Sequence, residues 1–350
     1  MTMEPRKINV AVVGLGFMGM THLRAYLASD SARVTAVCGA SRLPVNGVLQ
    51  GVKGNIKTNS DDIHLGPQVK VFRGIEGLLA DGEVELVDIC TPTPVHPEQC
   101  IAALRAGKHV LCEKPLAMTK AEALTLLARQ KQAGVKIGEA FMVRTHPQWL
   151  RARELITSGR IGDLRSVTGF FSYFNRDPAN IRNIPAYGGG ALMDIGCYAI
   201  TASRFAFAEE PSRVLGLVAR DPDMQVDRLV SAILDFPSGH ATFTCSTQLA
   251  PYQRLHFLGT QGRIEIEIPF NAPNDRPCRI FIAEGRDGVG KEIVTETFDT
   301  CDQYTIQGDA FSRAIREGGE VPVSLSDGIN NMAVIEAIFR SADSGQWERP

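Results

Sequence analysis

One short segment near the start of the chain constrains the fold more than any other. An apolar run at residues 10–13 leads into three glycines spaced as G-x-G-x-x-G, and a helix-like stretch follows. In such a unit the first glycine allows a tight turn, the second lets a pyrophosphate approach the backbone, and the third lets the helix pack on the strand. The helix N-terminus also offers unpaired N–H groups to phosphates. An ordinary tight turn is the alternative. We predict that a dinucleotide binds here through Gly14, Gly16, Phe17, Met18 and Gly19.

The first 140 residues alternate apolar runs with amphipathic stretches. The expected strands are Ile8–Val13, Val34–Cys38, Leu86–Cys90, His109–Cys112 and Val135–Ala140. Several of these runs lack period-2 alternation, as is typical of a parallel sheet buried on both faces. Strand–helix–strand spacing in series indicates an α/β fold. We therefore predict an N-terminal Rossmann domain over residues 1–140.

Residues 141–350 show a different pattern, in which strands come in adjacent pairs joined by turns. A turn sequence at residues 237–240 separates two expected strands, 229–236 and 241–248, and this is a hairpin signal. Further strands are expected at 255–258, 263–268, 279–283 and 293–298, with helices near 190–207, 304–317 and 326–342. The pattern predicts a C-terminal α+β domain with an open, mostly antiparallel sheet.

Composition excludes several classes of protein. The 37 Lys and Arg residues nearly balance the 39 Asp and Glu residues, so we expect no nucleic-acid partner and no anionic membrane partner. No apolar run reaches the roughly 18 residues that span a bilayer, and no signal-peptide cleavage pattern follows the N-terminal apolar run. The eight cysteines show neither C-x-x-C nor zinc-ligand spacing. We therefore expect a cytoplasmic protein with reduced thiols and no metal.

The end of the second expected strand bears on the choice of nucleotide. An NAD site usually has an acidic residue there to bind the ribose hydroxyls, but this chain has none between residues 31 and 60. Ser41 and Arg42 follow the strand instead, and both side chains can donate hydrogen bonds to a 2′-phosphate. We predict NADP as the cofactor. In the alternative, Arg42 is only a solvated loop cation and NAD also binds.

Two further segments carry chemically active side chains. Glu113-Lys114-Pro115 follows an expected parallel strand, where ligands of such sheets bind. Farther along, a run of three glycines precedes Asp194 and Tyr198, which are four residues apart and would share one face of a helix. Each residue alone is also compatible with an ordinary structural role.

Taken together, these motifs resemble the glucose-fructose oxidoreductase/inositol dehydrogenase (Gfo/Idh/MocA) family. The matching segments are Gly14–Gly19, Thr91-Pro92 with His96, Glu113–Pro115, Gly159–Gly162, Gly188–Asp194 and Gly259–Gly262. The resemblance implies a Rossmann domain, an open-faced sheet domain for substrate binding and oligomerisation, and hydride transfer between a nicotinamide and a sugar or polyol. It implies Lys114 and Asp194 as catalytic residues. Where many members have His, this chain has Tyr198, which resembles the branch of NADP-dependent xylose dehydrogenases and dihydrodiol dehydrogenases.

The implied chemistry gives each of these residues a role. Alcohol oxidation needs a base for the hydroxyl proton, and a free Tyr has a pKa near 10, so the Lys114 ammonium would favour the Tyr198 phenolate. Asp194 would hold a sugar hydroxyl or orient Lys114. Glu113 would orient Lys114 or reach the nicotinamide-side ribose. We also expect the cofactor to be lined by Thr91, Pro92 and His96, although His96 could instead be a packed helix residue.

Substrate contacts are less constrained by the sequence. We expect Arg144, His146 and Arg182 to face the substrate, with salt bridges as the alternative. Aromatic residues at strand spacing in 170–174 are more typical of a core or a subunit contact than of a sugar platform. Segment 262–268 alternates apolar and charged residues, as suits a sheet with one face exposed or packed on another subunit. We expect a homodimer or homotetramer.

The favoured hypothesis is an NADP-dependent sugar dehydrogenase that oxidises C1 of an aldose to a lactone. Dihydrodiol oxidation or keto-sugar reduction is the second hypothesis, and a non-catalytic NADP-sensing protein is the third. An enzyme that keeps its nucleotide while exchanging hydride between two sugars is a fourth. The sequence does not identify the substrate. The positions of a few side chains decide which hydroxyls are bound, and residue spacing does not fix these positions.

Overall fold

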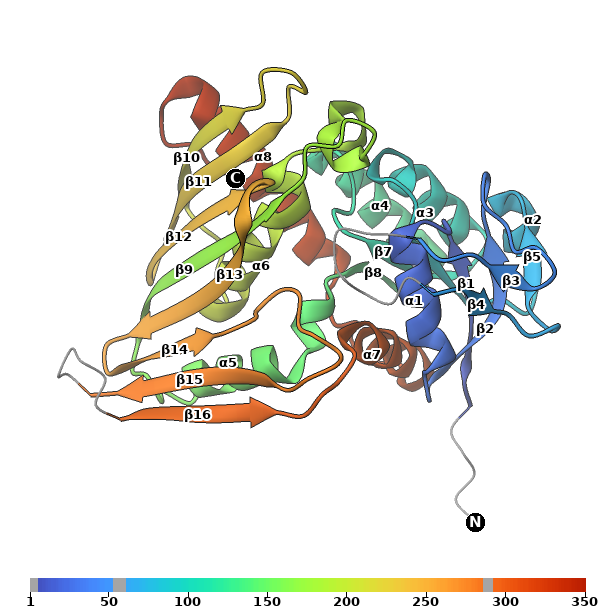
Figure 1. Ribbon diagram of the computed structural model, residues 1–350, viewed down its shortest axis with the longest axis horizontal. Coiled ribbons are helices and arrows are strands. Elements are labelled where there is room, and N and C mark those ends of the chain that lie inside the picture. The colour runs from blue at the N-terminus through green and yellow to red at the C-terminus, as the bar shows by residue number, and fades with distance from the viewer. Residues whose placement is uncertain (1–5, 53–60, 286–291) are drawn as a thin grey trace, which may run out of the picture. The chain divides into compact units, whose positions relative to one another are not determined.

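The structure is a computed structural model that describes residues 6–52, 61–285 and 292–350 (Figure 1). The chain divides into two compact units, each of which is built from two stretches of sequence. Unit 1 comprises residues 1–145 and 302–329, and unit 2 comprises residues 146–301 and 330–350.

Unit 1 is built on a parallel sheet, which has six strands within the described residues. Its spatial order is β5-β2-β1-β6-β7-β8. The strands are β1 (Ile8–Val13), β2 (Ala32–Cys38), β5 (Lys70–Phe72), β6 (Leu86–Ile89), β7 (His109–Glu113) and β8 (Ile137–Ala140). Counted along the chain this order is 3-2-1-4-5-6, which is that of a Rossmann domain, and the strand order reverses between β1 and β6. The predicted fold of this part is confirmed.

Helices cover both faces of this sheet. They are α1 (Phe17–Leu27), α2 (Ile75–Leu79), α3 (His96–Arg105), α4 (Lys120–Ala133) and α7 (Gln303–Glu317). In β1, Ala11 and Val13 join a core cluster with residues of α2, α3 and α4. Val10 and Val12 join a second cluster with residues of α1 and α7. Burial on both faces explains why the strand is apolar throughout.

Helix α7 completes unit 1 although it lies more than 150 residues beyond the rest of that unit. The Asp302 carboxylate caps its N-terminus by accepting the backbone N–H groups of Tyr304 and Thr305. Phe311 is 1% exposed in the core cluster of α1, and a Cβ on Gly308 would lie 2.7 Å from the Tyr26 ring. The close approach of α7 to α1 therefore depends on the missing side chain at residue 308.

Unit 2 contains a mostly antiparallel sheet, with eight strands in the part that the structure describes. The order is β10-β11-β12-β9-β13-β14-β15-β16, and among these pairs only β12 and β9 run parallel. The strands are β9 (Leu164–Phe174), β10 (Arg213–Arg220), β11 (Asp227–Phe236), β12 (Gly239–Ser246), β13 (Gln248–Gly259), β14 (Gly262–Ile266), β15 (Cys278–Glu284) and β16 (Ile293–Phe298). The predicted open sheet is confirmed, including the β11–β12 hairpin.

Helices pack on one face of this sheet. They are α5 (Pro147–Thr157), the π-helix η5 (Leu192–Gly196), α6 (Cys197–Phe207) and, from residue 330 onward, α8 (Leu325–Ser344). A Cβ on Gly169 would lie 3.3 Å from Ala199 of α6, and a Cβ on Gly216 would lie 2.8 Å from Ile338 of α8. Because side chains alternate along a strand, Phe170 and the 75% exposed Leu217 lie on the opposite face.

The remaining elements are short. They are β3 (Val48–Leu49), β4 (Ile63–His64) and the 3-10 helices η1 (Thr93–Val95), η2 (Met142–Thr145), η3 (Ile181–Asn183) and η4 (Pro185–Tyr187). Across the described ranges, no helix combines the length and the apolar character that a membrane crossing requires.

Candidate active site

The glycine turn of unit 1 has the geometry that a pyrophosphate needs. Gly14 has φ +91°, and a Cβ there would lie 2.8 Å from the backbone of Cys90. A Cβ on Gly19 would lie 1.7 Å from the Gly14 carbonyl oxygen, so the helix packs against the turn. Among the described atoms, nothing lies within 4 Å of a Cβ on Gly16. Helix α1, all of which is described, has no side-chain cap and no acid in its first turn. These residues fit a dinucleotide, whose phosphates would meet uncapped N–H groups.

The end of β2, where an adenosine ribose is expected, contains both a cation and a nearby acid. Ser41 is exposed, and the Arg42 guanidinium donates a hydrogen bond to the Gln50 carbonyl. Burial and then the charge of Glu76 raise the pKa of the Cys38 thiol. Glu76 lies in the first turn of α2. A negative charge from another element thus acts on the end of β2, which inspection of the β2 segment alone could not reveal.

His96 joins the turns that follow β6 and β7. It is 1% exposed, with Nδ1 3.0 Å from the Pro115 carbonyl oxygen and Nε2 2.7 Å from that of Thr91. Burial lowers the pKa of His96. The Thr91 hydroxyl donates to Gln99 at 2.7 Å, and Pro92 precedes the first residue of η1. His96 therefore contacts the backbone of both loops and, as a neutral imidazole, donates its one N–H to one of the two carbonyls.

Glu113 and Lys114 lie where β7 ends. Glu113 is 6% exposed, its Oε1 lies 2.9 Å from Nε2 of His22, and its Oε2 accepts the backbone N–H of Lys114 at 3.1 Å. Burial alone would raise the pKa of Glu113, but the hydrogen bond and charge of His22, with a smaller contribution from Lys114, lower it. The peptide bond between Lys114 and Pro115 is cis. A buried, ionised carboxylate thus precedes the predicted catalytic lysine.

In unit 2, Asp194 is held by two donors. Its Oδ2 accepts the Tyr173 hydroxyl at 2.6 Å and Nε of Arg182 at 3.1 Å, and 13% of its side chain is exposed. The charge of Asp194 is the largest influence that raises the pKa of Arg182. Burial, followed by the charge of Asp194, raises the pKa of Tyr173. The structure thus pairs Arg182, predicted to contact substrate, with the predicted catalytic aspartate.

Tyr198 lies in the first turn of α6, close to the same group. Its ring is 5.9 Å from the Phe171 ring and 5.6 Å from the Phe270 ring, centroid to centroid, and the residue is 6% exposed. The Tyr198 phenol is among the groups that raise the pKa of Arg182. Four polar side chains therefore gather at one place, which we call the Asp194 cluster: Tyr173, Arg182, Asp194 and Tyr198.

Asp194 lies on a widened helical turn that the sequence pattern does not reveal. The spacing predicts a regular helix near 190–207, but η5 is a π-helix before α6 begins. The Asp227 carboxylate accepts the Leu192 N–H at 2.7 Å, and Gly190 has φ +121° with its missing Cβ only 1.9 Å from Asp227 Oδ1. Burial raises the pKa of Asp227 to about 6. Single π turns often occur at functional sites.

The other two predicted substrate contacts have protein partners. In unit 1, Nη1 of Arg144 lies 3.2 Å from Oδ2 of Asp327. In unit 2, His146 is 1% exposed and caps α5, its Nδ1 accepting the Gln148 N–H at 3.2 Å. Burial lowers the pKa of His146 to about 4. The salt-bridge alternative thus describes Arg144, and His146 has the contacts of a neutral helix cap.

Sequence inspection missed two groups. Tyr173 is in contact with Asp194, and its only signal was its place in the aromatic run 170–174. His22 pairs with Glu113, but in the sequence it is one polar residue within the helix after the glycine turn. The eight cysteines, all within the described ranges, have free thiols, and seven are buried. Among the described residues, one group has metal-ligand proximity: donor atoms of His22, Asp88 and Cys90 lie within 4.8 Å of one another.

Comparison with known proteins shows that the chain is an NAD(P)-dependent oxidoreductase and identifies its family. Residues 8–141 match the oxidoreductase family model of the NAD-binding Rossmann fold, and residues 149–265 match the GFO/IDH/MocA C-terminal domain. The chain belongs to the Gfo/Idh/MocA family.

Individual relatives cover most of the chain. An oxidoreductase of Rhizobium meliloti is 43% identical over 79% of this chain and 83% of the relative. D-xylose 1-dehydrogenase (NADP(+)) 2 of Haloferax volcanii is 37% identical over 78% of this chain and 83% of the relative. The crystal structure of aldose-aldose oxidoreductase from Caulobacter crescentus, complexed with glycerol, has a TM-score of 0.84 at 25% identity and covers 99% of this chain and 100% of that one.

Proposed function

We propose that this protein is an NADP-dependent sugar dehydrogenase that oxidises C1 of an aldose to a lactone. The observation that carries the proposal is the Asp194 cluster, in which a phenol, an aspartate and an arginine are grouped in a largely buried place. The similarity to a D-xylose 1-dehydrogenase (NADP(+)) over most of the chain supports the substrate class and the cofactor.

The proposed roles follow from ordinary acid–base chemistry. The nicotinamide, when bound, accepts the hydride. Tyr198 takes the hydroxyl proton, and the cations Arg182 and Lys114 favour its ionised form. Asp194 is an acceptor when ionised, and it holds a sugar hydroxyl while Tyr173 and Arg182 fix its orientation. In the reverse direction Tyr198 donates the proton, and Lys114 stabilises the negative charge that develops on the oxygen.

The test is turnover of a panel of aldoses, cyclic polyols and dihydrodiols with NADP and with NAD. We expect Tyr198→Phe and Lys114→Ala to lower kcat by about 10²-fold or more, with the dissociation constant for NADP nearly unchanged. The exposed Lys131→Ala is the matched control for Lys114→Ala. Wild-type rates in both active-site variants would refute these roles. Tight NADP binding without turnover of any panel member would favour a sensing protein.

The same panel, extended to keto-sugars with NADPH, separates the second function from the first. Faster reduction of a keto-sugar than oxidation of any aldose, or turnover of a dihydrodiol alone, would favour the reductase or the dihydrodiol dehydrogenase. Co-purification of NADP with the protein would favour hydride exchange between two sugars without release of the nucleotide. The phenol and the aspartate serve all of these reactions, so the cluster alone does not separate them.

The cofactor preference is testable at β2. Ser41 and Arg42 support NADP, because hydroxyl and guanidinium groups donate to a 2′-phosphate. Glu76 is the observation that favours NAD, because a carboxylate accepts hydrogen bonds from ribose hydroxyls and repels a phosphate. We expect Arg42→Ala to raise KM for NADP roughly tenfold without changing KM for NAD, and Glu76→Gln to lower KM for NADP. A larger effect of Arg42→Ala on NAD would refute the assignment.

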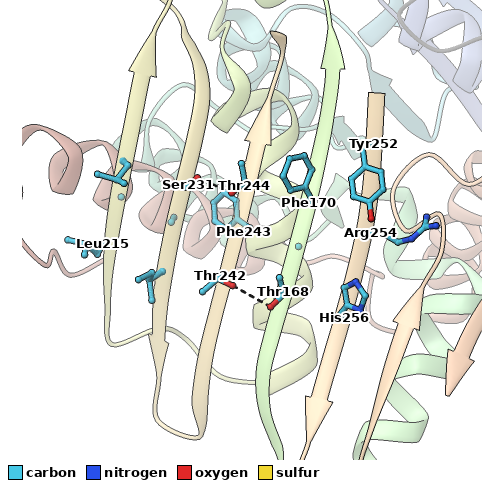
Figure 2. A pocket seen from close by; sticks show the side chains of 15 residues that line it. Thr168, Phe170, Leu215, Ser231, Thr242, Phe243, Thr244, Tyr252, Arg254 and His256 are labelled. Carbon is cyan, nitrogen blue, oxygen red and sulfur yellow. Dashed lines mark hydrogen bonds between the residues drawn. The ribbon is translucent and has the colours of Figure 1, made fainter. Parts of the chain in front are cut away.

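A homodimer or homotetramer is the proposed assembly, with a second copy on the open face of the unit 2 sheet. Figure 2 shows Thr168, Phe170, Tyr252 and His256 on neighbouring strands of this face, around a shallow hollow of about 390 Å³. Leu217 is 75% exposed there, and exposed apolar patches often mark interaction surfaces. We expect Leu217→Asp to lower the mass measured by light scattering to that of one chain. A monomeric wild-type protein would exclude this assembly.

A further inference from the structure

A second charged group lies entirely inside unit 1, beneath the glycine turn. His22 comes from α1, Asp88 from β6 and Glu113 from the end of β7. His22 is 1% exposed and Asp88 is 0% exposed. Nδ1 of His22 lies 2.8 Å from Oδ2 of Asp88, and Nε2 lies 2.9 Å from Oε1 of Glu113. One imidazole thus spans two buried carboxylates on adjacent strands.

The protonation state of this group follows from its donors. A neutral imidazole has one N–H, so its other nitrogen would present a lone pair to a carboxylate oxygen. The imidazolium ion donates at both nitrogens and compensates part of the charge of the two acids. Burial alone would lower the pKa of His22, but the charge of Asp88 raises it well above its ordinary value. The position of the ring between two carboxylates therefore favours its imidazolium form.

This arrangement extends to the predicted catalytic lysine through the backbone. Nε2 of His22 forms an ion pair with Oε1 of Glu113, without the angles of a hydrogen bond, and Oε2 of the same carboxylate accepts the Lys114 N–H at 3.1 Å. His22 lies six residues after Gly16, on the helix whose N-terminus offers N–H groups to phosphates. The contacts thus connect the helix of the glycine turn with the turn that carries Lys114.

We propose that His22 is a positioning residue, which as an imidazolium holds the Glu113 carboxylate and thereby fixes the backbone at Lys114. This inference rests on the proposed function of Lys114, but the charge state of His22 does not. The groups that face this ion pair, from every element packed on it, are Tyr26, Asp88, Cys90, His96, Lys114 and Tyr304.

A metal ion is the competing explanation, because His22, Asp88 and Cys90 have ligand proximity. A metal would require the Cys90 thiolate, and burial, followed by the charge of Asp88, raises the pKa of that thiol. The Sγ atom lies 3.5 Å from Nδ1 of His22 and 3.6 Å from Oδ1 of Asp88, as expected for a protonated thiol beside an ion pair. The geometry therefore favours the ion pair.

The first experiment reads the charge of His22 without any substrate. NMR of full-length protein labelled at histidine, with His22→Gln to assign the signal, should show an imidazolium at about pH 7, above the ordinary value near 6.5. The exposed His64 provides the internal reference signal in the same spectra. A neutral His22 signal at about pH 7 would overturn the proposal. So would one equivalent of zinc per chain that His22→Gln or Cys90→Ala removes.

The second experiment tests positioning through a split between kinetic constants. We expect His22→Gln to lower kcat roughly ten- to hundredfold, as for other residues that orient an active-site group, with KM for the sugar little changed. His64→Gln and Cys90→Ala should keep kcat. A lower melting temperature with unchanged kcat at ambient temperature would show a merely structural role and refute positioning.

The pH profile provides the sharpest readout. Without the His22 cation, burial should raise the pKa of Glu113. The kcat of His22→Gln should therefore fall on the acid side of the pH profile, where the kcat of wild type does not. Glu113→Gln has no carboxyl to titrate, so the double variant His22→Gln/Glu113→Gln should not show this fall. A fall that persists in the double variant would contradict action through Glu113. If wild type turns over no substrate, the function of Lys114 fails while the NMR result still stands.

Discussion

Two deeply buried carboxylates, Glu113 in unit 1 and Asp227 in unit 2, have pKa values shifted in opposite directions. Glu113 faces the cation of His22, which lowers its pKa against the effect of burial. Asp227 has backbone donors, foremost the Leu192 N–H, while the charge of Arg220 contributes less, and burial prevails. A buried acid thus stays ionised when a cation contacts it, whereas N–H donors alone leave it able to take up a proton near neutrality.

Asp194 resembles Glu113 in this comparison, because Arg182 contacts its carboxylate. The difference is exposure: 13% of the Asp194 side chain is accessible, against 8% for Glu113 and none for Asp88. The ion pair that His22 forms with Glu113 and Asp88 is nearly closed to solvent, so it can only hold its surroundings in place. The ion pair of Asp194 is more exposed, so its carboxylate can also accept a hydrogen bond from a ligand.

The largest effect is expected when the cation beside Asp194 is removed, which tests whether this ion pair takes part in the chemistry. Arg182→Met should lower kcat by about 10²-fold, because the carboxylate loses an ion pair and Tyr198 loses a neighbouring positive charge. Steady-state kinetics with the best substrate would measure this loss. Arg176→Met, on an exposed arginine paired with Asp223, is the control. A kcat within twofold of wild type would mean that Arg182 has no role in the chemistry.

A smaller change removes only the neutral donor. Tyr173→Phe keeps the ring but deletes the hydroxyl that donates to Asp194 at 2.6 Å. One hydrogen bond to a charged acceptor is worth about 1.5 kcal/mol, so we expect a roughly tenfold lower kcat/KM. Measured in the Arg182→Met background, the effect should differ from that in wild type, because both donors share one oxygen atom. Strict additivity would contradict a shared role.

The smallest expected effect is the pH dependence of the stability that Asp227 contributes. Its folded-state pKa of about 6 exceeds the ordinary value near 3.9, so the folded protein binds this proton more tightly than the unfolded chain does. Its contribution to stability is complete below about pH 3.9 and is lost as the pH rises through about 6.

We therefore expect the melting temperature of wild type, minus that of Asp227→Asn, to increase by a few degrees between about pH 7.5 and about pH 5. The exposed Asp223→Asn should show no such trend. A difference that shrinks on acidification would mean that Asp227 is ionised throughout and that its pKa is not raised.

Local patterns predicted the fold well, because its strongest constraints are local. The glycine turn, the apolar β1 and the β11–β12 hairpin all depend on neighbours in sequence. The long β13 was expected only at 255–258, because its first half is mostly exposed and contains Pro251, which weakens a strand signal. The segment 53–60, part of an irregular region in the sequence, lies outside the described residues.

The sites were harder to predict because their contacts join distant segments. Asp194 and Tyr198 were found from one helix pattern, but the π turn beneath them depends on Asp227, more than 30 residues away. Arg182 was found as a polar residue, yet its partner was not. The pairing of His22 with Asp88 and Glu113 depends on strands that only the assembled sheet brings together.

The discontinuous construction of unit 1 has a consequence for how the protein is made. Phe311 lies in the same core cluster as Val10 and Leu23, so one face of the Rossmann sheet, which α1 covers in part, lacks the rest of its cover until α7 is present. During synthesis, a nascent chain that has emerged only as far as residue 300 would expose the part of that apolar face on which α7 packs. We expect the first unit to mature only as translation nears its end, so a premature stop codon after Cys301 would destroy a domain encoded mostly before residue 146.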